Sequence, residues 1–256
     1  MSKTISIVLI IIFLIVIKLV HVFYFRSTKK QCIMLSKLLS IYSRKRKRKK
    51  LLDIFMKFRD YTMIPQGTYC ENLILMDNVE GVPGVIVECG TWKGGMIAGI
   101  AAILGDEREY LLFDSFEGLP PAKEIDGARA IEWQADTNSP GYYDNCSASE
   151  ESAHRAMKLS GVSNVSIVKG WFNETLPSAS FANGIAVLRM DADWYDSTME
   201  ILNSLFHQVN TGGIIIIDDY YDWDGCSKAV HDFLSQNNKV ERIRNFPSGV
   251  CYIVKS

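Results

Sequence analysis

One stretch of this chain, residues 85–95 (VIVECGTWKGG), constrains the fold more than any other. It opens with β-branched residues too apolar for a surface strand, breaks at a glycine turn, and runs into an Ala/Ile/Leu-rich segment, residues 96–104. A strand, a glycine turn and a helix N-terminus present free backbone N–H groups that hold an anionic or nucleoside ligand. Glu88 ends the apolar run, and an ionised side chain at such a position usually has a ligand to hold. The stretch by itself predicts a nucleotide-like ligand.

The rest of the chain alternates between expected strands and helices. Strands are expected at residues 85–88, 110–113, 166–168, 185–190 and 213–217, and helices at residues 51–61, 94–104, 150–159, 197–209 and 226–235. Residues 61–67 are expected to form a frayed helix end and a turn. The chain closes with an expected hairpin, residues 242–246 and 250–254. This order predicts an α/β fold with a doubly wound, mostly parallel seven-stranded Rossmann-like sheet and a C-terminal antiparallel hairpin. Such an ending resembles class I methyltransferase sheets more than a plain nicotinamide-binding fold.

Acidic residues end further strands of the expected sheet. Asp114 ends the second strand, 26 residues after Glu88, where an acid binds a ribose diol in sheets of this class. The alternative for Asp114 is a turn or helix-cap acid that shares this task with Ser115.

Four more acids follow the fourth and fifth strands, as Asp191, Asp193, Asp218 and Asp219. If these two strands are neighbours, the carboxylates come within a few ångströms of one another, and like charges then raise one another's pKa. A hard divalent cation such as Mg²⁺ removes that cost, and a spare carboxylate could serve as a base toward a hydroxyl. The alternative is that Asp193 caps the helix near Ser197 while Asp219 faces solvent.

The first 50 residues differ in character from the remainder, because they hold 13 Lys and Arg and no acid. Residues 5–25 are almost all apolar and long enough to cross a bilayer core of ~30 Å. An uncleaved anchor is therefore expected, with a cleaved signal peptide or a peripheral helix as alternatives. The basic run at residues 44–50 follows this segment, so the body is expected on the cytoplasmic side, near anionic lipid headgroups. No aromatic residue is interleaved in the run, which disfavours a nucleic-acid partner; a solvated linker is the other alternative.

The expected organisation is a transmembrane anchor at residues 1–25, a basic juxtamembrane linker at 26–50, and one domain at 51–256, forming a single-pass membrane protein. The chain of 256 residues, 48% of them hydrophobic, is long enough for one full core. Its six cysteines form no CxxC pair, which predicts reduced thiols and no zinc site.

Several motifs resemble the macrocin O-methyltransferase (TylF-like) family, which are class I S-adenosylmethionine-dependent sugar O-methyltransferases. The motifs lie in order at residues 61–64, 87–95, 114–120, 169–172, 175–177, 188–198, 212–220 and 229–233, so the resemblance covers about residues 55–256. It implies an S-adenosylmethionine donor, a Mg²⁺ ion and a sugar hydroxyl as the acceptor.

The resemblance also implies roles for particular residues. The donor-binding residues would be Thr62, Met63, Glu88, Gly90, Thr91, Asp114, Ser115 and Phe116. Among these, Glu88 and Gly90 would lie by the methionine part, Asp114 by the ribose, and Ser115 and Phe116 by the adenine. Metal ligands would be Asp191, Asp218 and Asp219, and the catalytic residues would be Asp191 together with Asp193, the expected general base.

Two parts of the chain depart from the family pattern as read from these motifs. The anchor and basic linker are expected to lie outside it, and residues 125–149, where the family places a substrate lid, show no usable helical or strand period. The acceptor therefore stays open; a membrane anchor would suit a lipid-linked sugar, and a homo-oligomer is possible. Other readings of the chain are a non-catalytic, membrane-tethered nucleoside-binding module and a nicotinamide oxidoreductase. The latter would lack a full GxGxxG, since Trp92 stands in the glycine turn.

Overall fold

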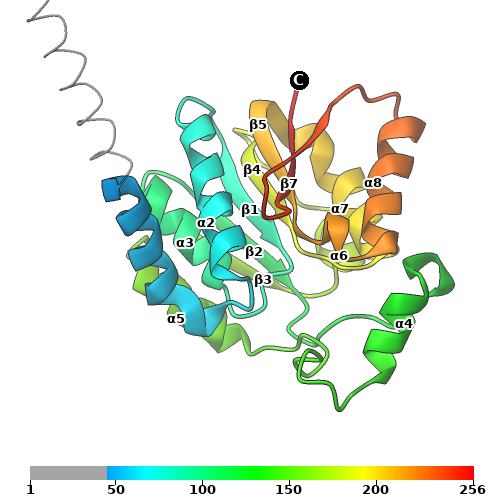
Figure 1. Ribbon diagram of the computed structural model, residues 1–256. Coiled ribbons are helices and arrows are strands. Elements are labelled where there is room, and N and C mark those ends of the chain that lie inside the picture. Colours follow the sequence, from blue (N-terminus) through cyan, green and yellow to red (C-terminus); the bar gives the residue numbers. More distant parts are fainter. Residues whose placement is uncertain (1–44) are drawn as a thin grey trace, which may run out of the picture. The chain divides into compact units, whose positions relative to one another are not determined.

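The computed structural model describes residues 45–256, and the compact unit considered below is Leu51–Ser256 (Figure 1). The expected anchor, and the linker up to residue 44, lie outside the described residues. Across residues 45–256, no helix combines the length and the apolar character needed to span a bilayer.

One seven-stranded sheet runs through this unit in the order β3-β2-β1-β4-β5-β7-β6. Its strands are β1 (Val85–Cys89), β2 (Tyr110–Asp114), β3 (Val165–Lys169), β4 (Ile185–Met190), β5 (Val209–Ile217), β6 (Ile243–Asn245) and β7 (Cys251–Val254). The first five are parallel, and β7 pairs antiparallel with both β5 and β6. The mostly parallel sheet with its antiparallel end is confirmed, and β4 and β5 are neighbours.

Helices cover both faces of the sheet, because the central strands are apolar on both sides. In β5, Ile214 and Ile216 pack into one core and Ile215 and Ile217 into the other. The first face carries the helical residues 51–58, which continue into η1 (Arg59–Tyr61), with α2 (Gln66–Leu75), α3 (Gly95–Leu104) and α5 (Glu150–Ser160). The second face carries α6 (Phe172–Thr175), α7 (Tyr195–Leu205) and α8 (Asp224–Gln236). A further helix, α4 (Ala128–Ala135), lies away from the sheet (Figure 1).

Three helices were not expected from the sequence: α2, α4 and the four-residue α6. Residues 65–67 were read as a turn, but α2 begins at Gln66, directly after Pro65, whose fixed φ and missing N–H suit a helix start. Helix α4 has eight residues and buries only Ala130, so the segment is too short for a helical period to be recognised. The helix expected at residues 197–209 is present with different bounds, because α7 spans Tyr195–Leu205, the 3-10 helix η4 follows at Phe206–Gln208, and Val209 begins β5.

The ends of β1 and β4 approach each other most closely at Gly90. This residue has a φ of +83°, and a Cβ added to it would lie 1.6 Å from the carbonyl oxygen of Asp191. The Asp191 amide in turn donates to the Cys89 carbonyl at 2.9 Å. No side chain fits between these two strand ends, so a glycine is required here for a steric reason as well as a conformational one.

We expect Gly90→Ala to lower the free energy of unfolding by about 2–4 kcal/mol, the sum of a left-handed backbone penalty and overpacking. Gly161→Ala is a matched control, since Gly161 has a φ of +91° but open space around its added Cβ. That control should lose only about 1–2 kcal/mol, the backbone penalty alone. Urea unfolding of both variants measures the difference, and equal losses would contradict the steric argument.

Candidate functional site

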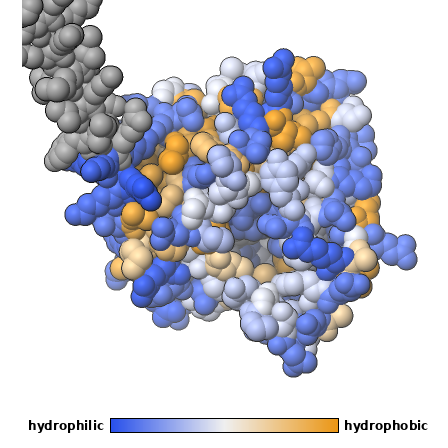
Figure 2. Space-filling view, in the orientation of Figure 1, coloured by the Kyte–Doolittle hydropathy of each residue, from blue (hydrophilic) through white to orange (hydrophobic). Residues whose placement is uncertain are grey.

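A cavity of about 1330 Å³ opens where the parallel strands end. Its wall is built from the loops that follow β1, β2, β4 and β5, together with the segment before α2 and parts of residues 117–146. Its mouth is visible as a hollow near the middle of Figure 2. Ligand pockets commonly measure 300–1,000 Å³, so this cavity has room for two ligands side by side.

Most of the expected donor-binding residues lie in the wall of this cavity. They are Thr62, Met63, Glu88, Gly90, Thr91, Asp114 and Ser115. Phe116 is different, because its side chain is buried in the apolar core rather than lining the cavity. The adenine contact expected of Phe116 therefore finds no support in the arrangement of its side chain.

Asp114 binds the backbone of the glycine turn. Its Oδ2 accepts the N–H groups of Thr91 and Trp92, both at 2.7 Å, and its Oδ1 accepts that of Phe116 at 2.7 Å. Burial raises the pKa of Asp114, while these three N–H groups act in the opposite direction. Asp114 therefore acts in part as a turn acid, as the alternative interpretation expects. Its carboxylate accepts two of the backbone N–H groups that were expected to face a ligand. The ribose contact of Asp114 stays a prediction.

Arg189 is a functional residue that was not singled out from the sequence. It lies in β4, is 1% exposed, and pairs with Glu88 Oε1 at 3.0 Å, Asp191 Oδ2 at 2.8 Å and Asp218 Oδ1 at 2.6 Å. The signal available in the sequence was a charge inside an otherwise apolar strand, since such a charge must find partners. Its partners are acids that end three different strands of the sheet.

Glu88 retains one oxygen without a partner. Its Oε1 binds Arg189, whereas Oε2 is buried and accepts no hydrogen bond, although the residue lines the cavity. Burial raises the pKa of Glu88 to about 8, and the Arg189 charge only partly counters this. The hydroxyl of Thr91, in the same wall, is likewise buried without a partner. An unsatisfied buried polar group in a cavity wall indicates a ligand that supplies the missing bond.

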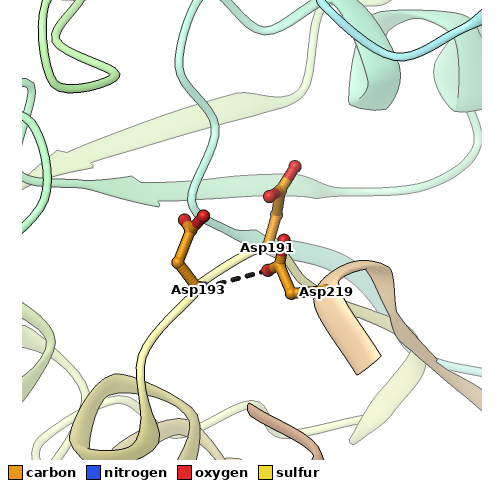
Figure 3. Close-up of side chains that lie close together, drawn as sticks. All are labelled: Asp191, Asp193 and Asp219. Carbon is orange, nitrogen blue, oxygen red and sulfur yellow. Dashed lines mark hydrogen bonds between the residues drawn. The ribbon is translucent and has the colours of Figure 1, made fainter. Parts of the chain in front are cut away.

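Three carboxylates converge at the ends of β4 and β5 (Figure 3). Asp191, Asp193 and Asp219 each offer one oxygen, and these oxygens lie within 4.8 Å of one another. Asp219 Oδ2 accepts the N–H groups of Ala192 and Asp193, at 3.0 and 2.9 Å, so the loop after β4 folds around it. The fourth expected member, Asp218, is ion-paired with Arg189 instead of joining this group, and its role as a metal ligand stays a prediction.

The alternative readings of these acids do not hold. Asp219 is 7% exposed and does not face solvent. Helix α7 begins at Tyr195 after an N-cap at Trp194 that makes no side-chain cap bond, so Asp193 is not its cap. The Asp193 Oδ1 instead accepts the indole N–H of Trp223 at 2.9 Å.

Burial and mutual repulsion act on all three carboxylates of the group. The pKa of Asp191 is raised to about 6, and those of Asp193 and Asp219 are raised well above the ordinary value, first by burial and then by the neighbouring acids. Carboxylate oxygens are the ligands preferred by Mg²⁺ and similar hard cations. The donor set and its charge therefore fit a divalent cation.

Tryptophans form another part of the cavity wall. The rings of Trp133, Trp194 and Trp223 meet edge to face, with centroids 5.1–6.1 Å apart. Trp133 comes from α4, and the Arg129 guanidinium of the same helix lies 5.0 Å from the Trp223 ring centroid. The segment without a recognisable period thus supplies one ring, Trp133, of the aromatic wall next to the acidic group.

The strand order, the glycine turn and the acidic edge together define a class I methyltransferase fold. The chain belongs to the macrocin O-methyltransferase (TylF) family, whose sequence profile matches residues 20–252. The match starts at residue 20, so the basic linker lies within the family pattern and the expectation that it lies outside is wrong.

Two curated relatives and two solved structures illustrate the similarity. The 8-demethyl-8-(2,3-dimethoxy-alpha-L-rhamnosyl)-tetracenomycin-C 4'-O-methyltransferase of Streptomyces olivaceus is 35% identical over 171 residues, 64% of this chain and 62% of that protein. Demethyldecarbamoylnovobiocin O-methyltransferase of Streptomyces niveus is 35% identical over 160 residues, 59% of this chain and 58% of that protein. The aligned part is therefore about three fifths of these relatives' length.

Among solved structures, the O-methyltransferase NovP superimposes with a TM-score of 0.66 at 29% identity, over 77% of this chain and 82% of NovP. The calicheamicin methyltransferase CalS11 shares the fold, with a TM-score of 0.55 at 19% identity, over 81% of this chain and 91% of CalS11.

The raised pKa values predict how stability depends on pH when no divalent cation is bound. Asp219 holds its proton more tightly when folded than when unfolded, so the folded state loses stability as the pH rises above the unfolded pKa of about 4. Asp219→Asn keeps an oxygen to accept the two N–H groups and removes this charge. As the pH rises above about 4, we expect the variant's free energy of unfolding to fall less steeply than that of the wild type, by up to about 1.4 kcal/mol per pH unit.

Denaturant titrations over a series of pH values from about 5 upward, in EDTA, measure this slope. The exposed Asp136 provides a control, since Asp136→Asn should leave the slope unchanged. If the free energy of unfolding depended on pH in the same way in wild type and Asp219→Asn, ionisation of the buried Asp219 would not destabilise the fold, and the prediction would be wrong.

Proposed function

We propose that this protein is an S-adenosylmethionine-dependent O-methyltransferase that acts, with Mg²⁺, on a sugar hydroxyl of a glycosylated acceptor. The observation that carries the proposal is that Asp191, Asp193 and Asp219 converge in the wall of the same cavity that contains the glycine turn. Family membership and the NovP-like fold support the same class of reaction.

The donor fits the side of the cavity formed by the glycine turn. Glu88 Oε2 and the Thr91 hydroxyl lack partners there, and the donor's methionine part carries an ammonium group that could donate to them. The donor's sulfonium is also a cation, and the acids at the strand ends give this region a negative potential that favours it. Thr62 and Met63 would close over the donor from the segment before α2.

Asp193 is placed to act as the general base. The Trp223 N–H holds its Oδ1, which leaves Oδ2 for the proton of an acceptor hydroxyl. Asp191 and Asp219 belong both to the ligand set implied by the family and to the group of converging oxygens, so these two would hold the ion. When bound, the ion lowers the pKa of a coordinated hydroxyl, and the donor supplies the methyl group. The acceptor oxygen would form a bond to the methyl carbon as the methyl–sulfur bond of the donor breaks, S-adenosylhomocysteine would leave, and the hydroxyl proton would pass to Asp193.

The acceptor would lie against the aromatic wall. Trp133 is partly exposed beside the acidic group, with the buried Trp194 and Trp223 packed against it, and an apolar ring next to charged oxygens suits an amphipathic sugar ring. The name of one relative gives a rhamnosyl-bearing tetracenomycin C as its acceptor, and that of Mycinamicin III 3''-O-methyltransferase from Micromonospora griseorubida gives mycinamicin III.

Transfer assays with and without EDTA test this function. With a rhamnosylated acceptor we expect methyl transfer that EDTA abolishes and Mg²⁺ restores, because the ion lowers the pKa of the hydroxyl. Asp191→Ala should reduce turnover by about 10²-fold or more, the typical range for lost electrostatic stabilisation, while calorimetry shows S-adenosylhomocysteine binding retained. Full activity in EDTA would remove the metal role.

Calorimetry also separates the alternatives. Donor binding without turnover on any sugar would favour the non-catalytic binding module, and binding of a nicotinamide in place of S-adenosylmethionine would favour the oxidoreductase.

We further propose that the N-terminal 50 residues hold the protein at the cytoplasmic face of a membrane, where a lipid-linked sugar would be within reach. The apolar run at residues 5–25 and the basic run at 44–50 support this. Flotation with vesicles should carry the full chain to the top of the gradient, whereas a chain lacking residues 1–50 should stay at the bottom. Equal flotation would contradict the proposal, and so would equal rates of the two chains on lipid-linked and soluble sugars.

A further inference from the structure

Two buried tyrosines hold the two ends of helix α3. The Tyr69 hydroxyl donates to the carbonyl of Gly95, the first residue of α3, at 2.8 Å. The Tyr110 hydroxyl donates to the carbonyl of Gly105, just beyond its last residue, at 2.6 Å. Gly95 lines the cavity, whereas neither Gly105 nor Tyr110 does. The same type of hydrogen bond is thus made at the cavity end of α3 and at its far end. These two ends are about 15 Å apart, since each helical residue adds a rise of 1.5 Å.

The cavity end of α3 is in unusually close contact with the segment before α2. A Cβ added to Gly95 would lie 2.4 Å from the Tyr61 carbonyl oxygen and 2.9 Å from Thr62 Cβ. One turn further along the helix, a Cβ added to Gly99 would lie 2.0 Å from the Tyr69 hydroxyl. These two glycines lie on one face of the helix, so Tyr69 and the segment before it reach the helix backbone itself.

Tyr69 is also connected, through Pro65, to the segment that contains the residues expected to cover the donor. Its backbone N–H donates to the Pro65 carbonyl at 2.9 Å, and the Thr62 hydroxyl accepts the Ile64 N–H at 3.1 Å. Residues 61–65, which line the cavity, are therefore fastened at one end by the Tyr69 hydroxyl bond to Gly95. We call residues 61–65 the donor flap.

We propose that Tyr69 is a positioning residue for the methyl donor, acting through the donor flap. Its hydroxyl fixes the flap against the helix that follows the glycine turn, so both walls of the donor site are in place before the donor arrives. A site ordered in advance loses less freedom on binding, and this raises affinity. The proposal rests on the proposed function, because it takes the ligand at the glycine turn to be S-adenosylmethionine.

Tyr69→Phe and Tyr110→Phe form a matched pair for testing this role. Each removes one buried hydroxyl bond to a glycine carbonyl at an end of α3, so both should lower the melting temperature by similar amounts. In calorimetry with S-adenosylhomocysteine, Tyr69→Phe should raise the Kd about tenfold, the factor equivalent to one buried hydrogen bond. Tyr110→Phe should keep the wild-type Kd. In the transfer assay, Tyr69→Phe should raise KM for the donor and leave kcat at saturating donor unchanged.

Equal Kd values for the two variants would overturn the role of Tyr69, and so would a fall in kcat with KM unchanged. Wild-type protein that binds no S-adenosylhomocysteine would instead overturn the proposed function, so the two failures are distinguishable.

Hydrogen exchange on the wild-type protein tests the flap without any variant, should Tyr69→Phe fail to fold. Adding S-adenosylhomocysteine should slow exchange at the amides of Thr62, Met63 and Ile64, and leave the amide of Gly105 unchanged. Unchanged exchange across the donor flap would overturn the inference.

Discussion

The buried ion group around Arg189 is the interaction on which the site depends. Its guanidinium binds acids that end three neighbouring strands, β1, β4 and β5, and so connects them across the middle of the sheet. Burying a charge is costly unless its partners are close and well oriented, and removing one partner leaves an uncompensated charge. Arg189 therefore allows the buried Glu88 and the partly buried Asp191 and Asp218 to stand together at the strand ends, which their mutual repulsion would otherwise oppose.

Arg189 does not neutralise the whole edge of the sheet. Asp193 and Asp219 lie beyond its reach and are held by backbone N–H groups and by the Trp223 indole, which stabilise carboxylates without supplying a full positive charge. The excess negative charge therefore lies at one point, beside the cavity. A divalent cation placed there would be stabilised by the negative charge of three carboxylates that the fold already orients. The chain would not need to reorganise to bind it.

The sequence was informative where topology alone brings residues together. Because parallel strands end at one edge, the acids after strands four and five could be expected to converge, and the antiparallel ending could be read from its hairpin pattern. Pairings that depend on register could not be read in this way. Glu88 stands opposite Arg189 in the β1–β4 register, and a shift of one residue would place that guanidinium on the other face. Helices α2 and α4 were missed for local reasons: Pro65, Gln66 and Gly67 at the start of α2 have the composition of a turn, and α4 has only eight residues.

The hydrogen bonds of Asp114 change which ligand the glycine turn can be expected to bind. In dinucleotide-binding folds, the amides of this turn and the helix N-terminus receive a pyrophosphate. Here two of those amides, from Thr91 and Trp92, donate to the Asp114 carboxylate. A phosphate at this position would have to displace that carboxylate and would be repelled by it. A nucleoside ligand without phosphate, and with cationic groups near Glu88, meets neither obstacle. The same turn that first indicated a nucleotide therefore disfavours the nicotinamide dinucleotides and favours a donor such as S-adenosylmethionine.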